Sequence, residues 1–178
     1  MGGGEKVLFQ AISALQAVPN FDNDTILVYS GATMDPADLC KAVKDKFGTD
    51  INLSKNNLQF VKLTTHETML AANYPSWTLF WQLIAYNSVC AESLRAAPCD
   101  MFIDTIGVGF AYPLVKLFFG CKVISYTHYP TISSDMLKQI NTDQFNNKVS
   151  SSPVLKLGKY IYYRILMVLY SLCGFFVD

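Results

Sequence analysis

Three consecutive glycines stand before the first predicted helix. Gly2, Gly3 and Gly4 precede apolar residues that repeat with helical spacing up to Pro19. Glycines let backbone N–H groups approach a phosphate closely, and the positive end of a helix dipole favours an anion there. The spacing matches neither the G-x-G-x-x-G dinucleotide fingerprint nor a P-loop. The glycines therefore predict either a phosphate cradle or a flexible N-terminal tail.

A histidine and several hydroxyl groups follow the last predicted strand. His128 stands just past the end of that strand, and its near-neutral pKa range suits hydrogen bonding to a substrate. Tyr129, Thr131 and Ser133 continue the same loop. His128 also fits a structural role in a turn, and the hydroxyl groups fit capping of the helix that follows. We treat all four as candidates for lining a cleft, with His128 as the candidate catalytic residue.

Two acidic positions could also take part in chemistry. Asp104 ends a predicted strand, where its carboxylate can face the cleft or cap the turn at Gly107. Asp22-Asn23-Asp24 matches a D-x-D metal motif, but it precedes a strand, and we interpret it as a turn. The two histidines lie near no cysteine pair, which argues against zinc. We therefore expect no metal site.

Alternating strands and helices must position these residues. Strands are predicted at 25–30, 58–63, 100–104 and 121–126, and helices at 7–18, 35–47, 77–94 and 111–119. Asp35 and Ser76 are the expected N-caps of the second and third helices. The alternation predicts an α/β fold with a mostly parallel, Rossmann-like sheet and flanking helices. Ligands bind such sheets at the carboxyl ends of strands, where the glycine loop and His128 both fall.

Composition excludes several classes of protein. The chain has 178 residues, of which 51% are hydrophobic and 16% charged, against about 25% charged in typical domains. Fourteen Lys and Arg balance fourteen Asp and Glu, which argues against a disordered chain and a basic nucleic-acid binder. Five cysteines without C-x-x-C spacing predict reduced, mostly buried thiols, and no secretory signal follows Met1. The apolar excess indicates either a heavily buried domain or a surface that rests on a membrane.

The end of the chain is strongly apolar. Residues 155–177 predict a helix that is somewhat short for a membrane span, contains Arg164 and is interrupted by Gly174. Its aromatic residues gather near the ends, as interfacial residues do. We expect a buried helix or one that lies on a membrane or a partner without spanning. A polar stretch at 141–153 precedes it and is expected to form a loop.

Two segments resemble a known family. The run from Asp104 to Val123 and the run from Tyr126 to Leu137, with His128-Tyr-Pro-Thr-Ile-Ser as its most specific part, resemble the GDP-mannose-dependent α-1,2-mannosyltransferases of asparagine-linked glycosylation. Gly2-Gly3-Gly4-Glu5-Lys6-Val7 matches the glycine-loop motif of the same family. The match extends over nearly the whole chain and is looser between 32 and 70. These enzymes belong to glycosyltransferase family 4 and have the GT-B fold.

The resemblance implies a fold, a reaction and a location. It implies the acceptor-side domain of a two-domain GT-B enzyme, with the first strand and membrane anchor expected before the glycine loop and the donor domain after Asp178. The reaction is a retaining transfer from GDP-mannose to the dolichol-pyrophosphate-linked oligosaccharide, without a metal or other cofactor. Gly2 to Glu5 would bind the diphosphate or the acceptor, and His128 would bind the donor sugar or position the acceptor. The implied site is the cytosolic face of the endoplasmic reticulum membrane, with other mannosyltransferases of the pathway as partners.

Two further functions remain open at this stage. The chain can be a non-catalytic, membrane-associated binding module from a truncated glycosyltransferase, which docks through residues 155–177. It can also be a nucleotide-binding reductase, although the spaced glycine fingerprint and the ribose-binding acid of that class do not occur in the expected places. Because a GT-B active site lies between two domains, we expect that this chain alone transfers no mannose.

Overall fold

The computed structural model describes most of the chain. The described residues are 2–19, 21, 23–31, 35–55, 57–128, 131–140 and 153–178. Three sequence predictions therefore lie wholly or partly outside them: the turn that begins at Asp22, the candidate Tyr129, and nearly all of the polar loop. The elements along the chain are α1 (Gly3–Ala17), β1 (Leu27–Ser30), α2 (Pro36–Phe47), β2 (Gln59–Lys62), η1 (His66–Met69), η2 (Ala71–Asn73), α3 (Thr78–Ala96), β3 (Met101–Asp104), α4 (Tyr112–Phe119), β4 (Lys122–Ser125), α5 (Ser134–Gln139), α6 (Pro153–Cys173) and η3 (Gly174–Phe176).

The predicted strands and helices are all present, with shorter strands. Asp35 caps α2 as predicted, because its Oδ1 accepts a hydrogen bond from the N–H of Ala37 at 2.9 Å. The predicted cap of α3 is wrong. Trp77, not Ser76, is the N-cap residue, with a left-handed backbone (φ 56°) and no side-chain capping bond. The two short 3₁₀ helices η1 and η2 were not predicted, because each is a single turn without a periodic apolar pattern.

The strands form two parallel pairs. β1 pairs with β2 in the register Val28 to Phe60, and β3 pairs with β4 in the register Phe102 to Val123. Parallel pairing agrees with the sequence prediction. The predicted single sheet differs from what the described residues show, because no ladder joins one pair to the other.

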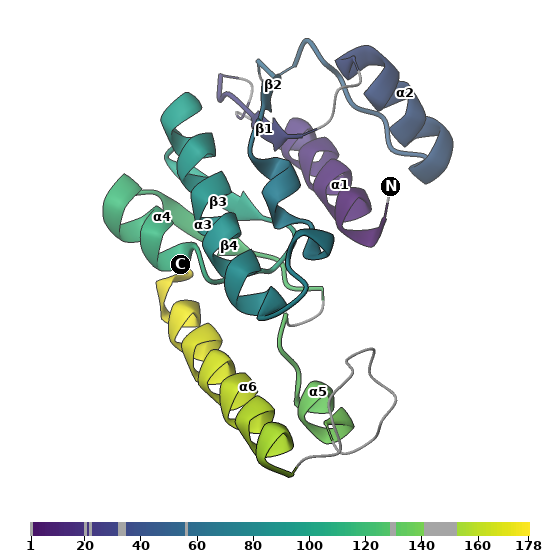
Figure 1. Ribbon diagram of the computed structural model, residues 1–178. Helices are drawn as coiled ribbons and strands as arrows, with labels where there is room; N and C mark the ends of the chain where they lie inside the picture. The colour runs from purple at the N-terminus through teal and green to yellow at the C-terminus, as the bar shows by residue number, and fades with distance from the viewer. Residues whose placement is uncertain are drawn as a thin grey trace.

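Each strand pair has its own hydrophobic core. α1 and α2 pack on β1 and β2 through Phe9, Ile12, Val28 and Val43. Figure 1 shows these two helices on the opposite side of the molecule from α6. The spacing of Phe9, Ile12 and Gln16 puts three buried side chains on one face of α1. Leu8 and Leu15 of the predicted apolar face are only partly buried beside them.

The second core is larger and extends over more helices. α3 and α4 cover one face of β3 and β4 through Leu94, Phe102, Val115 and Val123. A further cluster around Phe110, Ile132 and Leu166 joins α3, α5 and α6 to this core. All five cysteines are free thiols, and burial raises the pKa of Cys90 to about 12.

Two contacts join the halves of the chain. Tyr29 of β1 packs against the second core, although its neighbour Val28 belongs to the first. Glu92 of α3 accepts hydrogen bonds from the backbone N–H and hydroxyl groups of both Thr64 and Thr65, just after β2. These contacts join the part of the chain that contains β1 and β2 to the core around β3 and β4.

Candidate functional site

The glycine segment forms the first turn of α1. The helix begins at Gly3, and Gly2 occupies the N-cap position with an extended backbone. The N–H of Gly2 donates to Oε2 of Glu5, so the Glu5 carboxylate caps the first turn of the helix. The first N–H groups of a helix have no partner within the helix. An anion at this end would therefore be met by the N–H groups of Gly3 and Gly4, while Glu5 positions the turn.

The start of α1 lies against the ends of β3 and β4. A Cβ atom added at Gly3 would lie 3.8 Å from Nε2 of His128, and one added at Gly4 would lie 3.6 Å from the carbonyl oxygen of Thr105. The backbone at these glycines is therefore within van der Waals reach of both strand ends. The structure brings together two candidates that are more than a hundred residues apart in the sequence, and the imidazole faces the open end of a helix.

Asp104 has a structural role behind this site. Its side chain is buried, with 3% of its surface exposed. Oδ1 accepts from the N–H groups of Ile106 and Gly107 at 2.7 and 3.0 Å, and Oδ2 accepts from the Tyr112 hydroxyl at 2.8 Å. Of the two roles left open by the sequence, the structure shows the cap of the Gly107 turn. The cleft role is corrected, because the carboxylate points into the protein.

The turn that Asp104 caps is tightly enclosed. Gly107 has a φ of 78°, and a Cβ there would lie 2.8 Å from Cα of Thr127, a separation that real Cβ atoms do not tolerate. Its carbonyl oxygen accepts from the Tyr170 hydroxyl of α6 at 2.8 Å and from Oγ1 of Thr131 at 3.4 Å. The candidate Thr131 thus binds this turn. Thr127, which directly precedes His128, lies directly against this turn.

His128 itself is exposed at the surface. Its ring stacks on that of Tyr126, with 6.5 Å between the centroids and 25° between the planes. Both side chains are open to solvent, so a ligand at the start of α1 can reach the imidazole. The candidate Ser133 stands further along, at the N-cap position of α5. The described part of the loop therefore provides one exposed imidazole beside two hydroxyl-bearing residues.

The hydroxyl groups behind His128 remain protonated donors. Burial, with the nearby Asp104 carboxylate, raises the pKa of Tyr112 far above its ordinary value. Because the Tyr112 hydroxyl donates its hydrogen bond to Asp104, it accepts the hydrogen bond that it shares with the Ser125 hydroxyl. Within the described ranges, no three His, Cys, Asp or Glu side chains are grouped to hold a metal ion. The polar groups at the start of α1 are thus the backbone N–H groups of the glycines, the Glu5 carboxylate, the His128 imidazole and the carbonyl of Thr105.

Sequence reasoning missed several residues that build this site. Tyr126 stacks on His128, and Thr105 meets the start of α1. Tyr170 reaches the Gly107 turn from a helix 63 residues further along the chain. A tyrosine beside a strand end or within an apolar helix gives no periodic signal, because its role depends on a tertiary contact. The glycines Gly107 and Gly109, separated by one residue, were the available sign of a crowded turn.

Curated relatives of this chain share one printed name, GDP-Man:Man(3)GlcNAc(2)-PP-Dol alpha-1,2-mannosyltransferase. The relative from Caenorhabditis elegans is 38% identical over 97% of this chain and 37% of its own length. The relative from Dictyostelium discoideum is 35% identical over 98% of this chain and 35% of its own length. The relative from Homo sapiens is 34% identical over 97% of this chain and 35% of its own length.

The chain therefore spans about a third of the length of these relatives. No solved structure matches it. Identity at this level extends over nearly the whole chain. The family model described as ALG11 mannosyltransferase N-terminus matches residues 1–178, so the chain belongs to that family.

Proposed function

We propose that this chain is the acceptor-side part of a retaining α-1,2-mannosyltransferase, which uses GDP-mannose to extend a dolichol-pyrophosphate-linked oligosaccharide. The observation that carries the proposal is the meeting of the α1 start with His128, 3.8 Å from a Cβ position at Gly3. The relatives' printed name, which gives donor, acceptor and linkage, supports the choice of reaction. Since the chain matches about a third of those proteins, transfer itself requires the remainder of an enzyme.

The strand arrangement supports the GT-B form of this proposal. In the doubly wound order 3-2-1-4-5, the first strand lies between the second and the fourth. If a strand leads into Gly2 in a longer protein, β1 and β2 become the second and third strands, and β3 and β4 become the fourth and fifth. The two separate parallel pairs are what this order leaves when its central strand is not in the chain. A single Rossmann-like sheet is thus the proposed form of the complete domain.

The proposed chemistry uses backbone dipoles in place of a metal ion. In the transfer, the bond between mannose C1 and the GDP oxygen breaks, and a bond forms from C1 to the 2-hydroxyl oxygen of the acceptor mannose with the configuration kept. The proton of that hydroxyl leaves with the departing GDP. Negative charge develops on the diphosphate, and the N–H groups at the start of α1 are placed to stabilise it or the acceptor. His128 would hydrogen-bond the donor sugar or position the acceptor hydroxyl.

We place this activity at the cytosolic face of the endoplasmic reticulum membrane. A dolichol-linked acceptor keeps its lipid in the bilayer, so the enzyme must work at the membrane surface. The other mannosyltransferases that build the same oligosaccharide are the proposed protein partners. The exposed apolar residues of α3 and α6, among them Trp77, Trp81 and Ile165, support a location at a lipid interface. In the part of the chain that the structure describes, no helix has the length and apolarity needed to cross a bilayer.

A chimeric enzyme tests the proposed function. This chain would replace the matching third of the human relative, and transfer from labelled GDP-mannose to a lipid-linked acceptor would be measured. We expect transfer by the chimera and none by the isolated chain. His128→Ala in the chimera should lower turnover at least about tenfold, or about 1.4 kcal/mol, whereas Asp38→Ala on the outside of α2 should not.

The outcomes separate the possible functions. If the His128→Ala chimera folds and its kinetics are unchanged, His128 has only a structural role. A folded chimera that binds membranes but transfers no mannose would favour the non-catalytic binding module. Calorimetric titration with GDP-mannose on the isolated chain and on the chimera would show whether donor binding requires the rest of the enzyme.

A further inference from the structure

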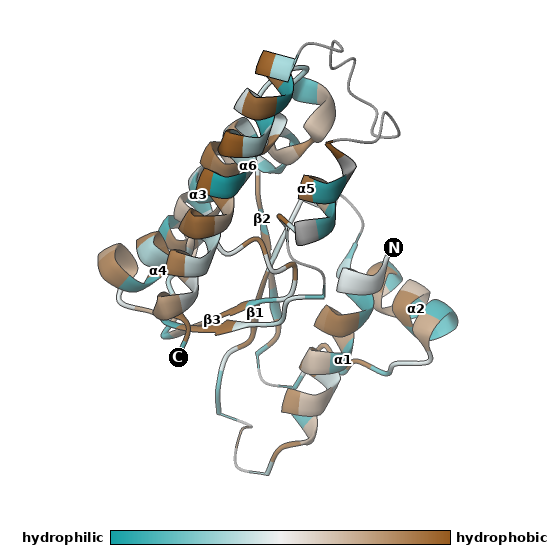
Figure 2. Ribbon diagram, turned by 90° about the horizontal axis from the view of Figure 1, so that it is seen from below, coloured by the Kyte–Doolittle hydropathy of each residue, from teal (hydrophilic) through white to brown (hydrophobic). Residues whose placement is uncertain are grey.

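The second histidine of the chain also stands at the carboxyl end of a strand. His66 begins η1, shortly after β2 ends at Lys62. Figures 1 and 2 show β1 and β2 between α1 on one side and α3 on the other. Ligands of parallel sheets bind beyond the carboxyl ends of the strands. His66 therefore occupies, on the first strand pair, the kind of position that His128 occupies on the second.

The ring of His66 lies on the backbone of Gly31, which directly follows β1. A Cβ atom added at Gly31 would overlap the ring, and its nearest atoms would be Cγ, Cδ2 and Nδ1 of His66. Only glycine permits this approach, because any other residue carries that Cβ atom. The atoms Cε1 and Nε2 are not among the three nearest, so this part of the ring lies further from Gly31.

A second contact fixes the tautomer of the imidazole. Nδ1 of His66 lies 3.0 Å from the carbonyl oxygen of Leu63, and because a carbonyl oxygen accepts, Nδ1 carries the hydrogen atom. Neutral imidazole has one N–H donor and one acceptor nitrogen, and the bond at one nitrogen sets the role of the other. Nε2 of neutral His66 is therefore an acceptor. Among the residues that the structure describes, this half-buried ring has no hydrogen bond through Nε2.

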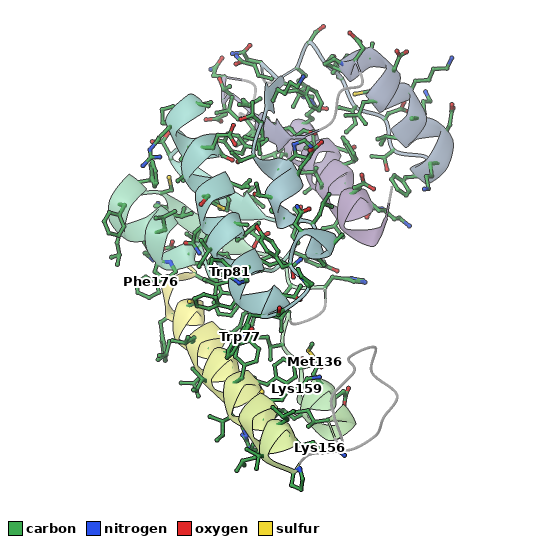
Figure 3. All side chains as sticks on the ribbon, in the orientation of Figure 1. Trp77, Trp81, Met136, Lys156, Lys159 and Phe176 are labelled. Carbon is green, nitrogen blue, oxygen red and sulfur yellow. The ribbon has the colours of Figure 1, made fainter. Side chains whose placement is uncertain are left out.

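η1 is held against α3 on both sides of His66. Glu92 of α3 binds the two threonines that directly precede the histidine. Gln82 of α3 donates from Nε2 to the carbonyl oxygen of Met69 at 2.8 Å. Figure 3 shows Trp77 where the same helix begins, close to α6. Because the turn is fixed before a ligand arrives, the imidazole can bind with little further loss of conformational entropy.

We propose that His66 binds the acceptor oligosaccharide, with Nε2 accepting a hydrogen bond from a sugar hydroxyl group. An acceptor nitrogen requires a donor on the ligand. Sugar hydroxyl groups are donors, whereas the oxygens of an ionised diphosphate are acceptors. The N–H groups at the start of α1 and the acceptor nitrogen of His66 therefore suit two different parts of the substrates, the diphosphate and the sugar.

This inference deepens the proposed function and rests on it, because the sugar acceptor is part of that proposal. In the strand order proposed above, β1 and β3 flank the strand that would lead into the glycine segment, so both histidines belong to one edge of one sheet. His66 would hold the acceptor from the side of β1 and β2. We therefore expect His66 to affect the affinity for the acceptor and not the rate of the chemical step.

Nuclear magnetic resonance on the isolated chain tests this assignment, because two histidines give only two imidazole spin systems. The variant His66→Asn identifies the signals of His66 by their loss. Nitrogen-15 spectra should show neutral His66 with its proton on Nδ1. Titration with an α-linked mannotriose should shift the His66 ring signals in a saturable manner, and titration with pyrophosphate should leave them unchanged.

The same spectra can overturn the proposal. A neutral ring with its proton on Nε2 would contradict the acceptor role. No saturable shift with mannotriose would show that His66 does not bind the acceptor sugar. A shift with GDP-mannose and none with mannotriose would assign His66 to the donor and overturn the proposal as well.

Two substitutions separate the two hydrogen bonds of His66 in the chimeric enzyme. Asn places its amide nitrogen near the position of Nδ1 and keeps a donor to Leu63, but it has no atom near the position of Nε2. Gln can place its amide oxygen near the position of Nε2. His66→Asn should raise KM for the lipid-linked acceptor about fivefold, the effect of one neutral hydrogen bond, with kcat unchanged. His66→Gln should stay within about twofold of wild type, and so should the control Glu67→Gln in the same turn.

A third variant displaces the ring without removing it. Gly31→Ala introduces the Cβ atom that overlaps the ring and should raise the acceptor KM as His66→Asn does. Gly158→Ala on α6 is the matched control, because nothing lies within 4 Å of the added Cβ atom. An unchanged acceptor KM in both His66→Asn and Gly31→Ala would overturn the proposal. Equal effects of His66→Asn and His66→Gln, each with a lower free energy of unfolding, would assign His66 a structural role and also overturn it.

Failure of this inference is distinguishable from failure of the proposed function. A chimera that transfers mannose with an unchanged acceptor KM after His66→Asn keeps the function and contradicts the inference. A chimera without transfer, beside a His66 signal that still responds to mannotriose, contradicts the function and keeps the inference. If a variant does not fold, the titration of the wild-type chain still decides.

Discussion

The first and second halves of the chain close their cores in different ways. In the first half, α2 buries Val43 and turns a row of charged residues, among them Lys41, Asp45 and Lys46, to the solvent. In the second half, α6 buries Tyr163 and Leu166 but exposes, on its other side, an apolar stripe along most of its length. Its members are Val154, Leu157, Ile161, Ile165, Val168 and Leu172. Both helices have a well-packed inner side, so the difference lies in what each outer side faces. Packing on the core explains the apolar residues on the inner side of each helix. The residue types on the outer side indicate what that side faces.

Two glycines with a left-handed backbone, one in each half of the chain, also differ in their surroundings. Gly48 ends α2 with a φ of 66° and has open space around it. Gly107 has a similar φ of 78°, but Thr127 and Tyr170 enclose it. A left-handed residue in the first half is thus a simple helix end. In the second half it is part of the frame that positions His128, so the two glycines should respond differently to the same substitution.

The largest predicted effect tests that contrast. Gly107→Ala should lower the free energy of unfolding by about 3 kcal/mol or more, because the left-handed backbone and the Thr127 backbone both oppose a Cβ atom. Gly48→Ala should cost only about 1 kcal/mol, from the backbone alone. Urea denaturation of the two variants measures both values. Equal losses would show that the enclosure of Gly107 contributes nothing to stability.

A second comparison concerns buried polar side chains. Tyr112→Phe removes the hydroxyl that donates to Asp104 at 2.8 Å, leaving a buried carboxylate oxygen short of a donor. The expected loss is about 1–3 kcal/mol. In the first half, Gln16 binds the backbone of Asn52 and Lys55 in an open loop, where water can replace it. Gln16→Met should therefore cost about 1 kcal/mol at most. A larger loss for Gln16→Met than for Tyr112→Phe would reverse the comparison.

A third prediction concerns the contact between the halves. The hydrogen bonds from Thr64 and Thr65 lower the pKa of Glu92 to about 2. Since the folded-state pKa lies below the unfolded value, the stabilisation is fully present above about pH 4.5. It is lost as the pH falls from there toward 2. Glu92→Gln should be less stable than wild type at pH 7, with a difference that shrinks below pH 4.5.

Urea denaturation of both proteins from pH 7 to pH 3 measures this convergence. Asp38→Asn on the exposed first turn of α2 serves as the control for the loss of one carboxylate. A difference between Glu92→Gln and wild type that stays constant over this range would show that the carboxylate charge does not hold the halves together.

The sequence predicted every long helix and the four strands, because each has a clear apolar period and is bounded by Gly, Pro or Asp. It also predicted that the glycine start and His128 would share one edge of the fold, from the rule that strand ends hold ligands. The role of Asp104 could not be chosen in advance, because a carboxylate after a strand fits both a cleft and a turn. Only the burial of Tyr112 and the N–H groups of the turn decide between them.

Other features depend on tertiary contacts that no local pattern contains. The separation of the strands into two pairs reflects which strands meet, and periodicity within one strand carries no such information. Tyr170 is placed by a contact with Gly107, which is 63 residues away in the chain. The stacking of Tyr126 on His128 depends on the conformation of the residues between them. The outer stripe of α6 was visible as excess apolarity at 155–177, but the sequence could not show that Trp77 and Trp81 of α3 would continue the same surface.

The smallest predicted effect tests the difference between the outer sides of α2 and α6. Ile165→Gln on the outer side of α6 should change the free energy of unfolding by no more than about 0.5 kcal/mol, because the side chain is open to water in the free protein. Lys41→Gln on the outer side of α2 should be equally neutral. The two helices would then differ in their effect on solubility, which the α6 variant should raise by shortening an exposed apolar stripe. Thermal unfolding and the protein concentration at the onset of precipitation measure the two properties. If Ile165→Gln lowered the free energy of unfolding by more than about 1 kcal/mol, the stripe would be packed in the free protein. The outer sides of α2 and α6 would then differ by burial within the protein and not by what surrounds them.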